Sequence, residues 1–143
     1  MTRTVRRPRD EQELAAALAL RIEVFCGEQG VAFDGDRDGL DDEAVHLVAV
    51  EDDALIGTCR LLIEPGGTAR FGRLCVRASA RGTGVGALLL AEAEREARAG
   101  GARRIGMHAQ TDALALYRRA GFRPYGERFD EEGIEHLGME KVL

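Results

Sequence analysis

A short glycine-rich segment is the part of this sequence best suited to chemistry. Residues 82–86 read Gly-Thr-Gly-Val-Gly and directly follow Arg81. Glycine permits positive φ and lets the main chain approach a ligand closely. Because the segment lies between an expected strand and an expected helix, its N–H groups and the positive end of the helix dipole would face an anion. The spacing predicts a phosphate-binding turn, although a turn that only packs a helix onto a sheet would use the same glycines.

The charge distribution around this turn favours an anionic ligand. Residues 65–91 contain no aspartate, glutamate or lysine, whereas the whole chain has a net charge of −5. The Walker pattern requires GK[ST] and the dinucleotide fingerprint requires GxGxxG, so neither describes the GxGxG spacing found here. The positive charge of the segment comes from four arginines, namely Arg70, Arg73, Arg77 and Arg81.

Cysteine and histidine residues give little basis for a metal centre. Cys26, Cys59 and Cys75 form no CxxC pair, and the three histidines show no HExxH spacing. An odd number of dispersed cysteines indicates a reducing compartment instead. Residues 34–39 begin like a calcium loop, DxDxDG, but the twelfth position is Val45, which cannot supply the bidentate carboxylate. We therefore predict no metal.

Hydrophobic spacing and turn signals predict the elements that position these residues. With 143 residues, 45% of them hydrophobic, the chain fits one soluble domain over residues 1–143. The pattern predicts an α/β fold of the α+β type, a mixed twisted sheet of about six to seven strands flanked by helices. The expected strands are residues 3–7, 46–51, 55–64, 68–76, 104–109, 124–129 and 135–142.

The expected helices are delimited by polar residues and glycines. A capping box of Asp10 and Glu13 opens the first helix, which should end at Gly27. A second helix follows the glycine-rich turn and ends before Gly100. A third is short, begins with Asp112 as its N-cap and closes at Gly121.

Two motifs resemble the signatures of the GNAT superfamily of N-acetyltransferases. Residues 81–86 (RGTGVG) are similar to its [RQ]xxGx[GA] acetyl-CoA loop, and residues 113–122 (ALALYRRAGF) to its AxxLYxxxGF signature. Residues 21–29 (RIEVFCGEQ) and 132–139 (EGIEHLGM) resemble the RxxVFxxEQ and EDGIPHIGM segments of its ElaA-like branch. The resemblance covers nearly the whole chain. It departs from the superfamily at Gln110, where Asn is common, and from typical sequences at His108 and Glu135, where Gly and Pro are usual.

The resemblance implies a cofactor site for acetyl-CoA. In this superfamily the strand that carries Leu74 and Val76 splays from its neighbour, and its main chain binds the pantetheine and polarises the thioester carbonyl. Donors aimed at a developing oxyanion can contribute about 3–4 kcal/mol. Cys75 and Gln110 are assigned to the same site. The pyrophosphate would be held by the remaining implied residues, which are Arg81, Gly82, Thr83, Gly84, Val85 and Gly86.

The catalytic residues are less well defined by the sequence. The resemblance implies that Tyr117 protonates the departing thiolate, a role suited to a phenol that stays protonated at neutral pH; a core aromatic is the alternative. Glu28 is the first candidate for the general base, because it lies in the loop that borders the acceptor pocket in this family. The three histidines, His46, His108 and His136, are the next candidates. An acyl-enzyme on Cys75 is disfavoured, because no histidine adjoins it in sequence.

The loop after the first helix is strongly acidic. Residues 28–43 hold seven acidic residues against Arg37 alone. We hypothesise that this loop attracts a cationic amine; a solvated acidic surface loop is the alternative.

These observations predict a cytoplasmic N-acetyltransferase that moves acetyl from acetyl-CoA to a primary amine, of a small molecule or a peptide, by direct attack in a ternary complex. A non-catalytic acyl-CoA-binding module or sensor is the main alternative, and a nucleotide-binding α/β protein the next. The net negative charge disfavours nucleic acid as a partner, and no apolar stretch approaches the ~20 residues of a membrane span. A homodimer is possible, and the sequence does not identify the acceptor.

Overall fold

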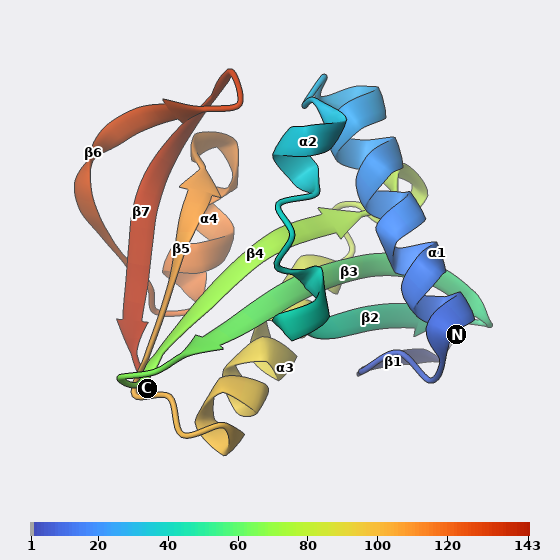
Figure 1. Cartoon of the computed structure of the whole chain (residues 1–143), viewed down its shortest axis with the longest axis horizontal. Helices are drawn as coiled ribbons and strands as arrows, with labels where there is room; N and C mark the ends of the chain where they lie inside the picture. The colour runs from blue at the N-terminus through green and yellow to red at the C-terminus, as the bar shows by residue number, and fades with distance from the viewer. Residues whose placement is uncertain (1) are drawn as a thin grey trace.

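The computed structural model describes residues 2–143, which form one seven-stranded sheet with helices on both faces (Figure 1). The strand order is β1-β2-β3-β4-β5-β7-β6. The expected mixed sheet and its number of strands are confirmed. The strands are β1 (Arg3–Arg6), β2 (Val45–Glu51), β3 (Ala54–Glu64), β4 (Thr68–Val76), β5 (Arg104–Gln110), β6 (Arg123–Glu131) and β7 (Ile134–Val142).

The helices cover the two faces of the sheet unequally. Helix α3 (Val85–Ala99) and the short α4 (Leu114–Arg119) pack on the larger core, whose fully buried members include Leu47, Leu61 and Ile105. Helix α1 (Glu11–Arg21) covers the other face over a smaller core with Leu20 and Val24. Among the described residues, no helix combines the length and the apolar character that a membrane span requires.

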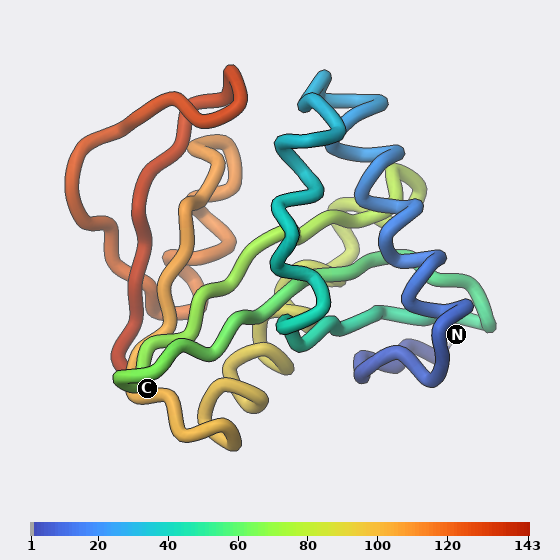
Figure 2. Tube along the Cα trace, viewed as in Figure 1, coloured from blue at the N-terminus to red at the C-terminus, as the bar shows by residue number. Residues whose placement is uncertain are grey.

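Strands β4 and β5 are parallel neighbours, and they separate soon after they pair. Their register covers only Thr68 with Arg104, Ala69 with Ile105 and Arg70 with Gly106. Beyond Arg70 the two strands diverge, as the tubes in Figure 2 show. On one side of the fork lies the antiparallel meander β1-β2-β3-β4, and on the other lies the group β5-β7-β6.

The first helix begins as expected and ends differently. Asp10 is extended, and its carboxylate accepts the Glu13 N–H at 2.9 Å. The return half of the predicted capping box is wrong, because the Glu13 carboxylate accepts the N–H of Arg9 instead. The α-helix also does not run to Gly27: from Ile22 to Glu28 the chain continues as a π-helix, η1. Val24 and Phe25 of this segment are buried with Leu20 in the smaller core.

The third predicted helix is shorter than expected, and Asp112 is not its N-cap. A 3₁₀ turn, η4 (Thr111–Ala113), precedes α4, whose N-cap is Ala113 without a side-chain hydrogen bond. The predicted stop at Gly121 is confirmed, with φ of 94°. Lys141 of β7 donates to the free carbonyl of Ala120 at 2.7 Å, so the neighbouring strand satisfies this helix end.

The acidic loop contains two short helical turns, α2 (Phe33–Asp36) and the 3₁₀ turn η2 (Asp41–Glu43). A further 3₁₀ turn, η3 (Ala78–Ala80), connects β4 to the glycine-rich turn. In Figure 1 the segment with α2 and the tip of the β6–β7 hairpin stand on opposite sides of the fork.

Candidate functional site

A β-bulge lies where β4 leaves β5. The β3–β4 register skips at Cys59, which faces the two residues Arg73 and Leu74, and Arg73 has a positive φ of 54°. Beyond the bulge, Arg77 donates its N–H to Ile56 of β3, so by strand alternation the N–H groups of Leu74 and Val76 face the opened side of the fork. The strand therefore offers main-chain donors that no neighbouring strand uses.

The glycine-rich turn follows this strand end and opens α3. Gly82 and Gly84 have φ of 75° and 93°, and a Cβ at either position would meet no atom within 4 Å. In the described chain the N–H groups of residues 82–87 have no hydrogen-bond acceptor, and Gly84 is the N-cap of α3. These donors and the helix dipole make the turn an anion-binding surface, as the sequence predicts.

Two of the predicted site residues pair with one another beside this turn. Arg81 Nη2 lies 2.7 Å from Glu28 Oε1, and Arg81 Nε also donates to the Val76 carbonyl at 2.9 Å. Both side chains are partly exposed. Glu28 does not line the cavity described next, so the structure brings it to the glycine-rich turn rather than to the interior of the fork.

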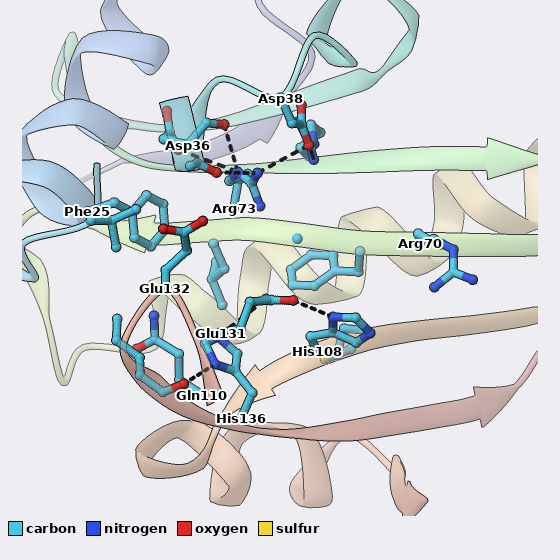
Figure 3. A pocket seen from close by; sticks show the side chains of 18 of the residues that line it. Phe25, Asp36, Asp38, Arg70, Arg73, His108, Gln110, Glu131, Glu132 and His136 are labelled. Carbon is cyan, nitrogen blue, oxygen red and sulfur yellow. Dashed lines mark hydrogen bonds and ion pairs between the residues drawn. The ribbon is translucent and has the colours of Figure 1, made fainter. Parts of the chain in front are cut away.

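A cavity of about 470 Å³ occupies the fork between β4 and β5 (Figure 3). One wall comes from η1 and the acidic loop, and the opposite wall from β5 and the β6–β7 hairpin tip. The floor includes the aromatic rings of Phe71 and Tyr117. Its polar lining consists of Gln29, Asp36, Asp38, Arg60, Arg70, Arg73, His108, Gln110, Glu131, Glu132 and His136.

Tyr117 lies on α4 with its ring in the core and lines this cavity. Its ring packs edge-on against Phe71 at 6.2 Å and against Phe122 at 6.0 Å between centroids. Burial raises the pKa of the Tyr117 hydroxyl, so the phenol remains a proton donor throughout the neutral range. The residue is thus a core aromatic that also lines the cavity.

The acidic loop is held to the sheet by a buried ion network. Arg21, which is 1% exposed, donates Nη1 to Asp41 at 2.7 Å and Nε to Asp36 at 3.2 Å. Burial opposes ionisation of Asp41, but the hydrogen bonds and charges of Arg21 and Arg60 outweigh it and lower the pKa of that carboxyl. The network anchors both turns of the loop.

The same network joins two charged segments of the sequence, the acidic loop and the arginine-containing segment 65–91. Arg60 Nη2 lies 2.7 Å from Asp38 Oδ2, and Arg73 Nη2 lies 3.2 Å from the same oxygen. The Arg60 hydrogen bond holds the pKa of Asp38 well below its ordinary value. Asp36, Asp38 and Asp41 are therefore not free to attract a cationic amine. Arg73, which the sequence counts in the positive charge of residues 65–91, is paired with the acidic loop.

A second polar cluster lies on the opposite wall. Glu131 Oε1 accepts from His108 Nδ1 at 2.9 Å, and Glu131 Oε2 lies 3.7 Å from His136 Nε2. His136 is 7% exposed, and its Nδ1 lies 2.7 Å from the Ile134 carbonyl. Glu132 reaches across to α2, where a Cβ on Gly35 would lie 2.5 Å from its carboxyl carbon.

The remaining candidates have structural partners. Gln110 donates its amide to Gln29 Oε1 at 2.9 Å, so the two residues connect β5 to the end of η1 across the cavity. Cys75 is buried on β4, and burial raises the pKa of its thiol to about 12. His46 lies outside the cavity and bonds the Asp41 carbonyl through Nε2 at 2.8 Å. In the described residues, no three His, Cys, Asp or Glu side chains are grouped to hold a metal ion.

Several cavity residues escape sequence reasoning. The sequence alone gives Glu131, Glu132, Gln29 and the arginines of the network no role in a cavity, because they come from separate segments that only the fold brings together. The sequence offers His108 and His136 as candidates for the general base only because of their residue type. Their register on β5 and β7 places both beside Glu131, and that register follows from strand pairing alone.

Comparison with known proteins agrees with this architecture. The family model of the acetyltransferase (GNAT) domain matches residues 11–143. The uncharacterized N-acetyltransferase YjcF of Bacillus subtilis is 34% identical over 134 residues, covering 93% of this chain and 95% of that protein. The chain therefore belongs to the GNAT acetyltransferase family and is an acyltransferase.

Solved structures support the same assignment. One from Lactobacillus plantarum superposes with a TM-score of 0.90 at 32% identity and covers 100% of this chain and 99% of that one. Escherichia coli ElaA superposes with a TM-score of 0.84 at 26% identity over 98% of each chain, which confirms the predicted resemblance to the ElaA-like branch. A Bacillus subtilis acetyltransferase with the same fold, at 19% identity and a TM-score of 0.75, was solved in complex with CoA. Acetyl-CoA is the general acetyl donor of this family.

Proposed function

We propose that this protein transfers acetyl from acetyl-CoA to a primary amine by direct attack in a ternary complex. The observation that carries the proposal is the coincidence of three features at one fork: main-chain donors on β4, a glycine-rich helix start and a cavity with titratable side chains. The first two suit the cofactor and the third suits an acceptor. A binding module alone would need no such polar cavity.

The residues at the fork fit the parts of acetyl-CoA. The N–H groups of residues 82–87 suit its pyrophosphate, with Arg81 at the edge of the turn. The outward N–H groups of Leu74 and Val76 suit the amides of pantetheine, with Cys75 between them and facing away. Gln110, at the opposite side of the fork, is proposed to border the same site. Acetyl-CoA would supply the thioester that the amine attacks.

Tyr117 is the proposed general acid. As the amine nitrogen bonds to the acetyl carbon, the C–S bond breaks and its electron pair leaves on sulfur. A neutral phenol beside the cavity can give its proton to that thiolate, and burial keeps Tyr117 neutral. Transfer through Cys75 is not proposed, because a thiol with a pKa raised to about 12 holds very little thiolate at neutral pH.

Glu28 is not the proposed base. Its carboxylate is 2.7 Å from Arg81 Nη2 and Glu28 lies outside the cavity lining, so the ion pair holds it at the glycine-rich turn and away from an acceptor in the cavity. We propose that the Arg81–Glu28 pair orders the edge of the cofactor turn.

Two measurements test the function. Calorimetry with acetyl-CoA, CoA, ATP and NAD should show binding of the CoA species alone. Release of free thiol should then be followed with spermidine, phenethylamine, glycinamide and a lysine-containing peptide as acceptors. Binding with turnover supports the enzyme; binding without turnover of any acceptor favours the sensor alternative. Absence of binding to either CoA species would overturn both.

A further inference from the structure

We propose that His136 is the general base that takes the proton from the attacking amine, with Glu131 stabilising its protonated form. The proposal rests on the acetyltransferase function proposed above and names a residue for the one step that it leaves unassigned.

The hydrogen bond of His136 fixes its tautomer. Its Nδ1 lies 2.7 Å from the Ile134 carbonyl, and a carbonyl oxygen can only accept, so Nδ1 carries the proton. In the neutral ring Nε2 is then left with a free lone pair. Stacking on Phe129, with centroids 5.9 Å apart and an interplanar angle of 22°, holds the ring in this orientation.

The free nitrogen faces the cavity and a carboxylate. His136 lines the cavity, and Nε2 is 3.7 Å from Glu131 Oε2, too far for a direct hydrogen bond but within ion-pair distance once the ring has accepted a proton. Glu131 also accepts from His108 Nδ1 at 2.9 Å, which fixes the carboxylate in place (Figure 3). On β5, β6, β7 and the β6–β7 turn, the charged or titratable residues that line the cavity with His136 are His108, Glu131 and Glu132.

The proton balance of the step is simple. The acceptor loses its ammonium proton to water before it attacks as a neutral amine. When its nitrogen bonds to the acetyl carbon, one N–H proton passes to His136 Nε2, while the thiolate gains the proton of Tyr117. His136 and Tyr117 return to their starting forms by exchange with solvent, and the products are the amide and free CoA.

The buried His46 provides a matched control for replacing His136. His46 is 8% exposed and His136 is 7% exposed, but His46 bonds the Asp41 carbonyl and lies outside the cavity. His136→Asn keeps a donor near the Nδ1 position, and His46→Gln keeps one near Nε2. Both variants remove a buried imidazole and retain its hydrogen bond, so they should lose similar stability in thermal unfolding.

The test combines kinetics with a readout that needs no acceptor. With the fastest amine of the panel above, H136N should lower kcat about 100-fold or more and lose the acidic limb of the pH profile, with the acetyl-CoA Kd within twofold. H46Q should keep both kcat and the limb. In nitrogen-15 spectra of the parent at pH 8, His136 should carry its proton on Nδ1 alone.

Each contrary result has a distinct meaning. H136N with kcat within threefold of the parent, or with the acidic limb intact, would overturn the base assignment while leaving the acetyltransferase function standing. A proton on Nε2 would also overturn it. Loss of activity in E131Q but not in H136N would make the carboxylate the base instead. A parent that binds acetyl-CoA but acetylates no amine would refute the proposed function, and the base assignment with it.

Discussion

The role proposed for Tyr117 would give this side chain two purposes, packing in the core and proton donation. The ring packs against Phe71 and Phe122 in the core, and the residue also lines the cavity. Tyr117→Phe keeps the packing and removes the proposed acid. We expect kcat to fall about 10- to 100-fold with acetyl-CoA affinity within twofold, measured by thiol release and calorimetry.

Tyr125→Phe is the matched control for this prediction. Tyr125 is 42% exposed on β6, packs over Gly138 and does not line the cavity. It should retain the parent kcat. A Tyr117→Phe enzyme with unchanged kcat would leave Tyr117 only its packing role.

The sequence predicted conformations that consecutive residues encode. It did not predict roles that depend on which side chains lie together in the fold. Gly82 and Gly84 have the positive φ that their turn requires, because the turn is encoded by consecutive residues. Glu28 had the charge for a base, but only the fold shows that Arg81 lies against it. Likewise, the acidity of residues 28–43 is visible in the sequence, whereas the pairing of three of its seven carboxylates depends on Arg21, Arg60 and Arg73 from other elements.

At the scale of elements, the proposed binding of acetyl-CoA by the turn before α3 can be tested separately from the strain that an alanine introduces at a positive φ. Gly84 and Gly101 both have positive φ, 93° and 85°, and open space where a Cβ would lie. Alanine at either position should therefore cost about 1–2 kcal/mol of stability from the left-handed conformation. Gly84→Ala should also weaken acetyl-CoA at least tenfold in calorimetry, whereas Gly101→Ala should bind it normally. Equal affinities in the two variants would mean that the turn is only structural.

The ion network predicts how pH affects the anchoring of the acidic loop. The pKa of Asp41 is lowered in the folded protein, so its charge stabilises the fold above the unfolded value, near pH 4, and this contribution is lost as pH falls below it. Asp41→Asn should lower the free energy of unfolding by about 3 kcal/mol at pH 7, because it leaves buried arginine donors without their charged partner.

Urea titrations at several pH values measure whether the stabilisation by Asp41 is lost as pH falls. The stability difference between the parent and Asp41→Asn should shrink as pH falls from 5 toward 2. The neighbouring Asp42→Asn, an exposed residue of the same turn, should change stability by less than 0.5 kcal/mol as a surface substitution. A difference that stayed constant with pH would show that Asp41 acts through packing and not through its charge.

Strand patterns and helix faces were predictable because they repeat locally, but the order of the last strands was not. β7 inserts between β5 and β6, and this order decides that His136 pairs with Gln110 at the fork. The π-helical turn of η1 also has no sequence period that distinguishes it from the α-helix before it. Elements were thus predictable from periodicity, and their junctions, where the cavity forms, required the tertiary structure.

At the scale of the molecule, a cofactor bound in the fork would contact both groups of strands, β1-β2-β3-β4 and β5-β7-β6. β4 and β5 share only three register pairs, so a ligand lying between them would add contacts that the sheet itself lacks. Acetyl-CoA at 100 times its Kd should stabilise the protein by about 2.7 kcal/mol. That free energy corresponds to a rise in Tm of about 5–10 °C.

The form of the unfolding transition then tests whether residues 1–143 are one domain. We expect a single calorimetric transition that moves as a whole with acetyl-CoA, and slower amide exchange at Leu74, Val76 and residues 82–87, whose donors are otherwise free. Gly84→Ala at the same ligand concentration should show a much smaller shift, and ATP should cause none. If only part of the transition moved, the meander and the β5-β7-β6 group would unfold separately, and the cofactor would stabilise one of them without coupling it to the other.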